Sequence, residues 1–346
     1  METGNYKKVA DVIVAETALR SFAIPEDGGS PAQRVAALIR QQCAGWPALQ
    51  QARQGLEQRC LRTVRLADTD VVLQCNPQRA KSATAAVDKA SIEKRPCFLC
   101  PDNLYPLQKA LLYQGDWLIL NNPFPIFYDH LVVSHADHLP QRIETALPAM
   151  FAFVRDLDYR YSVFYNGPAC GASAPDHLHF QACPAGELPL MAQLMRFNDT
   201  DSAAMQVSGS DAHGRGHWFV CELDRRALFV CRSAEPLLLV EQVRQVLSYL
   251  GQGCGSAQEP MVNVVIGGSP ERMLAVVMPR KAHRPACYFA EGAGQLLVSP
   301  GAVDVGGLVI LPRREDYESM TAEMVEQIFS EVCWGREVFS DFMMQA

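Results

Sequence analysis

Two histidines and a glutamine alternate along one short segment, where residues 176–181 read Asp-His-Leu-His-Phe-Gln. Alternate side chains of a β-strand share a face, so His177, His179 and Gln181 are predicted to point one way and the intervening apolar residues the other. A neutral imidazole is a competent nucleophile near pH 7, whereas an amide donates hydrogen bonds but moves no protons. A half-exposed strand with polar residues facing water is the alternative interpretation.

Two loops carry small and polar residues that suit a phosphorylated ligand. Residues 166–173 read Asn-Gly-Pro-Ala-Cys-Gly-Ala-Ser, so their backbone N–H groups and Ser173 could approach phosphate oxygens. Residues 120–127 read Leu-Asn-Asn-Pro-Phe-Pro-Ile-Phe. A flexible connection and a turn with a packed phenylalanine are the structural alternatives for these two loops.

Basic side chains elsewhere in the chain could neutralise ligand phosphates. Arg79 and Lys81 are the first candidates, and Arg280 and Lys281 are the second. For each of them, a solvated surface charge is the alternative.

The pattern H-x-H-x-Q after a strand and a glycine-rich loop resembles the transferase branch of the histidine-triad superfamily. That branch includes galactose-1-phosphate uridylyltransferase, diadenosine tetraphosphate phosphorylase and the GDP-hexose phosphorylases. The resemblance covers residues 70–185, and residues 306–312 and 139–143 are similar to the phosphorylase members more loosely. Hydrolases of the superfamily carry H-x-H-x-H instead, so Gln181 argues against a hydrolase.

The resemblance assigns roles to residues that match the family pattern. It implies that His179 attacks the α-phosphorus to form a covalent nucleotidyl-histidine, while Gln181 hydrogen-bonds the phosphoryl oxygens. Asn166 and Ser173 match active-site positions. Asn122 and Phe124 match the segment that contacts ribose and base.

A C-x-x-C pair, Cys97 and Cys100, has the spacing of a zinc site. The resemblance supplies the other two ligands: His177, and a downstream histidine that aligns best with His138. His135 competes for that last place, and His130 is a weaker competitor. Four nitrogen and sulfur ligands would close the coordination sphere, so this zinc is predicted to be structural.

The predicted fold class is α+β, with two fused histidine-triad-like halves, each an antiparallel sheet flanked by helices. Residues 1–65 are interpreted as an N-terminal helical cap, residues 66–204 as the catalytic half and residues 205–346 as a degenerate copy. The copies align when Pro184 is set against Pro279. His179 is then aligned with Leu274, so the second half lacks the predicted nucleophile.

Composition limits the partners. The net charge is −7, and no basic run suits a nucleic-acid backbone. The 12 scattered cysteines, with neither a signal peptide nor an apolar stretch long enough to span a membrane, predict a cytoplasmic protein with reduced thiols.

The sequence therefore predicts a nucleotidyltransferase or phosphorylase. Its donor would be a nucleoside diphosphate sugar or a dinucleoside polyphosphate, and its acceptor phosphate or a sugar 1-phosphate. The alternatives are a nucleotide hydrolase and a non-catalytic, zinc-stabilised nucleotide-binding protein. A homodimer is expected by analogy with the family.

Overall fold

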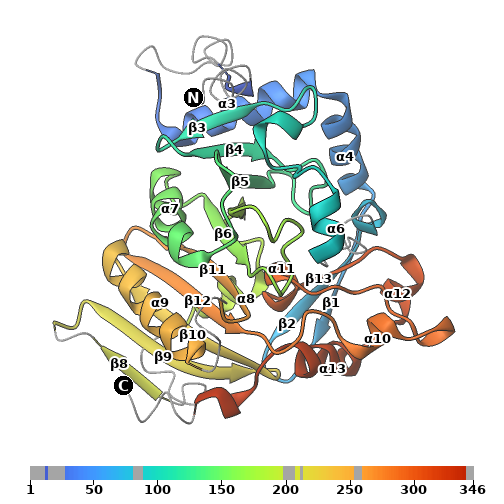
Figure 1. Ribbon diagram of the computed structural model, residues 1–346. Helices are drawn as coiled ribbons and strands as arrows, with labels where there is room; N and C mark the ends of the chain where they lie inside the picture. The colour runs from blue at the N-terminus through green and yellow to red at the C-terminus, as the bar shows by residue number, and fades with distance from the viewer. Residues whose placement is uncertain are drawn as a thin grey trace.

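The centre of the molecule is one antiparallel sheet of ten strands, which runs from the top of Figure 1 to the lower left. The structure is a computed structural model that describes residues 12–14, 28–80, 89–197, 207–210, 213–252 and 259–339. From edge to edge, the strands are β3 (Ala110–Tyr113), β4 (Trp117–Asn121), β5 (Leu131–His135), β7 (His179–Pro184), β6 (Tyr161–Asn166), β11 (Val262–Ser269), β12 (Arg272–Pro279), β10 (Arg226–Ser233), β9 (Gly216–Leu223) and β8 (Val207–Ser210).

One face of this sheet is covered by α3 (Pro31–Gly45), α7 (Ile143–Asp156) and α9 (Pro236–Gly251). Helix α3 begins at a capping box, in which the Ser30 hydroxyl accepts from the N–H of Gln33 and the Gln33 side chain accepts from the N–H of Ser30. The central strands are buried on both faces, which explains why β11 and β12 carry the apolar runs 264–266 and 273–278 instead of alternating.

The other face packs against α8 (Pro189–Leu194), α11 (Ala302–Val305) and a second sheet. This sheet contains β1 (Cys60–Arg65), β2 (Asp70–Cys75) and β13 (Leu308–Leu311), with β13 parallel to β2. Beyond it lie α12 (Arg314–Ser319) and α13 (Ala322–Val332), which close a further core (Figure 1). The shorter elements are α4 (Pro47–Glu57), η1 (Pro77–Arg79), α6 (Lys89–Lys94), η2 (Pro101–Asn103), α10 (Ala286–Phe289), η3 (Gly292–Gly294) and η4 (Arg336–Phe339). The α+β class is confirmed.

The large sheet repeats one strand order twice. The orders β3-β4-β5-β7-β6 and β8-β9-β10-β12-β11 are the same, and α7 connects β5 to β6 as α9 connects β10 to β11. Pro184 pairs with the first residue of β6, and Pro279 pairs with the first residue of β11, which matches the predicted alignment. The two predicted sheets are joined, because the edge strands β6 and β11 satisfy each other's backbone groups.

One predicted boundary shifts in the structure. The segment predicted to be helical up to residue 65 instead enters β1 at Cys60. Helix α13 ends at Val332, because the carbonyl of this residue accepts from Lys281 and Arg280 and the chain then extends beside Arg280. Of residues 1–27 in the predicted helical cap, the structure describes only 12–14.

The domain divisions at residues 65 and 204 stay predictions. The small sheet crosses the second division, because β13 comes from the predicted second half and β2 from the first.

A buried ion pair joins the small sheet to the large one. Arg226 and Asp224 are almost fully buried, with Nη2 of the arginine 3.2 Å from the carboxylate. Arg226 also donates to the carbonyl of Val305 and to the hydroxyl of Thr69, which lies in the turn between β1 and β2. Because both charges are shielded from water, each depends on the other.

We expect Arg226→Met to lower the free energy of unfolding by about 3–5 kcal/mol, because it leaves the Asp224 carboxylate buried without its partner. Urea denaturation measures this loss. The matched control is Arg215→Met, which breaks an exposed pair with Glu235 and should cost about 0–1 kcal/mol. Equal losses in the two variants would contradict the role given to the buried pair.

Candidate active site and metal centre

A cavity of about 590 Å³ lies against the face of β7 that carries His179 and Gln181. Leu178 and Phe180 point to the opposite face and pack in the core beneath α7, as the alternation predicted. The other predicted ligand-binding residues that line the same cavity are Asn122, Phe124, Asn166, Ser173 and Arg79. Lys81 lies outside the described residues.

His179 is held in one tautomer. Its Nδ1 lies 2.8 Å from the carbonyl oxygen of His177, and a carbonyl only accepts, so Nδ1 carries the proton in the neutral ring. The lone pair is then on Nε2. Burial lowers the pKa of His179, and the carbonyl of His177 opposes that shift in part.

The backbone of His179 is bracketed by Gln141, a buried residue on the loop before α7. The side-chain oxygen of Gln141 accepts from the backbone N–H of His179 at 2.8 Å, and its side-chain amide donates to the backbone carbonyl of His179 at 3.0 Å. The same amide donates to the carbonyl of Asn166 at 3.1 Å. One side chain therefore positions His179 relative to the glycine-rich loop.

Gln181 is oriented by His130. The Nδ1 of His130 accepts from the N–H of Ile126 at 3.1 Å, so the neutral ring carries its proton on Nε2. That Nε2 donates to Oε1 of Gln181 at 3.0 Å, and Nδ2 of Asn122 is 3.4 Å from the same oxygen. The amide nitrogen of Gln181 makes no hydrogen bond to the part of the chain that the structure describes, so it can donate into the cavity.

Asn166 joins three segments at the edge of the cavity. Its Oδ1 accepts from the N–H of Ala302 at 2.7 Å and from the amide of Asn263 at 3.1 Å. At Gly171, which has φ +111°, an added Cβ would lie 2.9 Å from Gly301, so this position requires glycine.

Arg79 and Arg280 have different environments. Arg79 donates to the carbonyl of Phe124 at 2.7 Å, and burial lowers its pKa to about 10, so it stays charged at neutral pH. Arg280 is buried and does not line the cavity. All five of its N–H groups donate to oxygen atoms of other residues, so its role is structural.

The sequence did not indicate that the second half lines this cavity. His283, Arg284, Ser299 and Asp304 form part of its wall, and Arg95 joins them from the first half. The basic stretch 280–284 was the only available signal, and it pointed to Arg280 and Lys281 instead.

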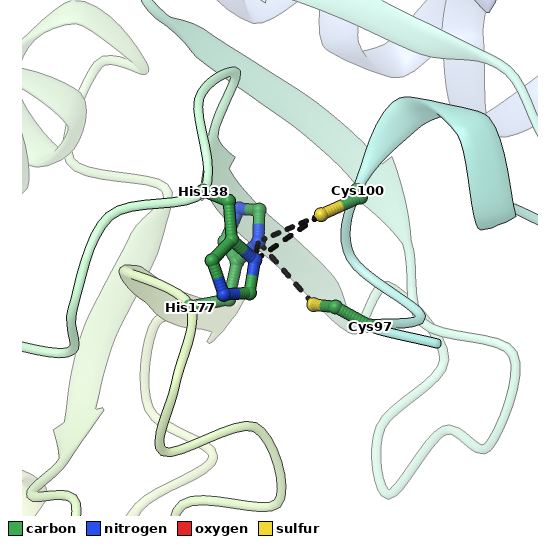
Figure 2. Close-up of side chains that lie close together, drawn as sticks. All are labelled: Cys97, Cys100, His138 and His177. Atoms are coloured by element: carbon green, nitrogen blue, oxygen red, sulfur yellow. Dashed lines mark hydrogen bonds between the residues drawn. The ribbon is translucent and has the colours of Figure 1, made fainter. Parts of the chain in front are cut away.

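The four predicted metal ligands converge in a second cluster, shown in Figure 2. One ligand atom from each of Cys97, Cys100, His138 and His177 lies within 4.8 Å of every other. The two Nδ1 atoms are 3.3 Å apart, and the closest S···N distances are 3.2–3.6 Å. Around a tetrahedral zinc with Zn–N of about 2.05 Å and Zn–S of about 2.3 Å, two nitrogen ligands lie about 3.3 Å apart, and a sulfur and a nitrogen ligand about 3.6 Å apart.

His177 is turned so that its lone pair faces the cluster. Its Nε2 lies 2.8 Å from the carbonyl of His135, so this nitrogen carries the proton and Nδ1 faces the sulfur atoms. The competing candidates for the fourth ligand lie elsewhere. His135 packs its ring on Trp117 and accepts from the N–H of Asp137, and His130 contacts Gln181. His177 precedes β7, so only two of the three polar residues lie on the strand.

Comparison with known proteins defines the fold more sharply. Residues 38–184 match the family model of a domain of unknown function, DUF4922, which is less than half of the chain. A comparison with curated proteins gives no match.

The fold is that of yeast Ap4A phosphorylase Apa2. Its crystal structure aligns with a TM-score of 0.53 at 15% identity, over 83% of this chain and 94% of that one. The same enzyme in complex with AMP aligns with a TM-score of 0.50 at 18% identity, over 84% and 97%. A uridylyltransferase is more distant, with a TM-score of 0.36 at 14% identity, over 68% and 89%. The predicted resemblance to a diadenosine tetraphosphate phosphorylase is confirmed at the level of the fold by the two structures of that enzyme.

His130 generates a prediction about stability and pH. Burial, with a contribution from Arg79, lowers its folded-state pKa to about 3, below the unfolded value of about 6.5. As pH falls, the unfolded chain binds the proton first, so stability is lost below about pH 6.5. Relative to His130→Gln, the wild type should lose roughly 2 kcal/mol between pH 7.5 and pH 5 in urea denaturation. Parallel pH profiles for the two proteins would contradict this environment for His130.

Proposed function

We propose that this protein is a nucleotidyltransferase of the phosphorylase type, with His179 as its nucleophile. The donor is a nucleoside diphosphate sugar or a dinucleoside polyphosphate, and the acceptor is phosphate or a sugar 1-phosphate. The observation that carries the proposal is the pairing of two oriented groups in one cavity. The imidazole of His179 keeps its lone pair on Nε2, and Gln181 keeps two amide protons for phosphoryl oxygens.

The reaction proceeds in two displacements. The lone pair of His179 forms a bond to the α-phosphorus, and the bond to the bridging oxygen breaks, releasing a sugar 1-phosphate or a nucleoside polyphosphate with the electron pair. An oxygen of the acceptor phosphate then attacks the same phosphorus and returns the electrons to the imidazole. Gln181 donates to the equatorial oxygens in both steps but moves no proton. Phosphate leaving groups need none, because they are stable as anions at neutral pH.

The nucleoside fits the apolar end of the cavity. Phe124 and Tyr105 meet edge-on with ring centroids 6.5 Å apart, and Leu99 and Val132 line the same wall. Such surfaces suit a base held by stacking and apolar contact. Asn166, whose carbonyl oxygen is occupied, offers its amide as a further donor to the phosphate.

Two other functions predict different products. A nucleotide hydrolase would release nucleoside monophosphate without added phosphate, and a non-catalytic binding protein would form no covalent adduct. Gln181 disfavours the hydrolase, because it cannot assist water as a base. The orientation of His179 disfavours a purely binding role.

A cytoplasmic location and a homodimer remain predictions. No helix in the described ranges is long and apolar enough to cross a membrane.

The cluster of two cysteines and two histidines fits a structural zinc ion. Its donor set, its distances and the proton on Nε2 of His177 agree with a closed tetrahedral site. Zinc there would fix the segment that leads into β7. The ion would take no part in the transfer.

A labelled donor tests the nucleophile. Incubated with α-³²P-labelled nucleotide sugars or diadenosine tetraphosphate, the wild type should retain label on the denatured chain, and added phosphate should discharge it. His179→Ala should retain none and lose at least about 10³-fold in turnover, because the covalent route is closed. His213→Ala, an exposed histidine outside the cavity, is the control and should behave as wild type. Undiminished turnover in His179→Ala would refute the assignment.

Metal analysis tests the zinc site. The wild type should carry about one zinc per chain, and Cys97→Ser and Cys100→Ser should lose most of it, because both remove a ligand from a four-coordinate site. Cys287→Ser changes a cysteine outside the cluster and should keep full zinc content. Equal zinc in all four proteins would eliminate the site as described.

A further inference from the structure

The wall contributed by the second half differs chemically from the rest of the cavity. It carries His283, Arg284 and Ser299 together, on two segments that follow β12. Ser299 links the other two, because its hydroxyl accepts from Nε of Arg284 at 3.0 Å and lies 3.4 Å from Nε2 of His283. No role proposed above for nucleoside, α-phosphate or metal uses these three side chains.

Arg284 is held in one direction. Its guanidinium carbon lies 4.3 Å from the centroid of the Tyr288 ring, and its Nε is bonded to Ser299. Stacking on one side and a hydrogen bond at Nε leave little rotational freedom. A guanidinium fixed in this way needs no further ordering when it meets an anion, which favours binding.

Both segments are clamped by one buried group. Arg280 donates to the carbonyls of Ala282 and His283 on one segment and to the carbonyl of Pro300 on the other. It also donates to Asn263, which in turn donates to Asn166 at the edge of the cavity. The wall with Arg284 is therefore tied rigidly to the loop beside His179.

The charge of the cavity favours a ligand with several negative charges. Arg79, Arg95 and Arg284 line it, and Asp304 is the one carboxylate among its described lining residues. Asp304 is occupied, because its two oxygens accept from the N–H groups of Gly301 and Ile310 at 2.9 Å. Arg95 already pairs with Asp176 at 3.5 Å, so an α-phosphate at His179 leaves Arg284, on the wall from the second half, to meet a further anion of the ligand.

We propose that His283, Arg284 and Ser299 form a second anion subsite that binds a phosphate group other than the one attacked by His179. This inference rests on the proposed function. The group is a phosphate in either of two forms. It is the terminal phosphate of a polyphosphate donor, or it is the inorganic phosphate that accepts the nucleotidyl group. The subsite would place that phosphate at a set distance from the reacting phosphorus, which selects substrates by the length of their phosphate chain.

Calorimetric titration of the full chain separates the two forms of phosphate. The four nucleoside monophosphates identify the preferred base. Its α,β-methylene triphosphate, which cannot react at the α-phosphorus, then probes the terminal phosphate. Inorganic phosphate, added with saturating monophosphate, probes the acceptor. Arg284→Gln should weaken binding of the triphosphate, the inorganic phosphate or both by about tenfold, because it removes a charged donor from the subsite. Monophosphate affinity should stay within twofold, and this also shows that the variant is folded.

Matched variants make the test specific. Arg336→Gln removes an exposed arginine that does not line the cavity and should leave all affinities unchanged. Ser299→Ala keeps the charge but releases Nε of Arg284, so it should give a smaller loss for the same probe. A loss confined to the triphosphate assigns the subsite to the donor, and a loss confined to inorganic phosphate assigns it to the acceptor. Unchanged affinity for both probes in Arg284→Gln would overturn the inference. Failure of every monophosphate to bind the wild type would instead refute the proposed function.

Discussion

The site depends on two hydrogen bonds made by His177, one by its side chain and one by its backbone carbonyl. Its Nε2 donates to the carbonyl of His135, which turns Nδ1 towards the two cysteines. Its own carbonyl accepts the Nδ1 proton of His179, which leaves the lone pair of His179 on Nε2. His177 thus belongs to the cluster of cysteines and histidines through its side chain, and it orients His179, the proposed nucleophile, through its backbone. Because one short segment makes both contacts, an ion bound in the cluster would stiffen the backbone beside His179.

Buried polar side chains carry out most of the positioning around this segment. Gln141 hydrogen-bonds the backbone groups of His179, and His130 hydrogen-bonds the side-chain oxygen of Gln181. Arg280 connects the loops of the second half to Asn263. A buried polar group without a partner is costly, so each of these networks has few alternative arrangements. The side chains of His179 and Gln181 are consequently oriented without a ligand, which is the preorganisation that the proposed function needs.

The two halves of the duplicated sheet contribute differently to the cavity. The strand that corresponds to β7 is β12, where Leu274 and Val276 pack in the core against α8 and α11. The second half supplies the segments after β12 that line part of the cavity. The joined sheet keeps the segments after β12 at a fixed distance from β7, because β7, β6, β11 and β12 are adjacent strands that pair in succession.

Local patterns in the sequence determined the α+β class, the internal repeat, the alternation around His179 and the C-x-x-C pair. These depend on periodicity and spacing over a few residues, which sequence displays directly. The family resemblance favoured His138 over His135 and His130 as the second histidine beside the cysteines, but only the tertiary structure decided among them. The three histidines lie within nine residues, and their strand and loop turn them in different directions. The tertiary structure also decided that Arg280 is structural while Arg284 lines the cavity, because burial and donor partners arise from segments distant in the chain, such as residues 263, 300 and 332.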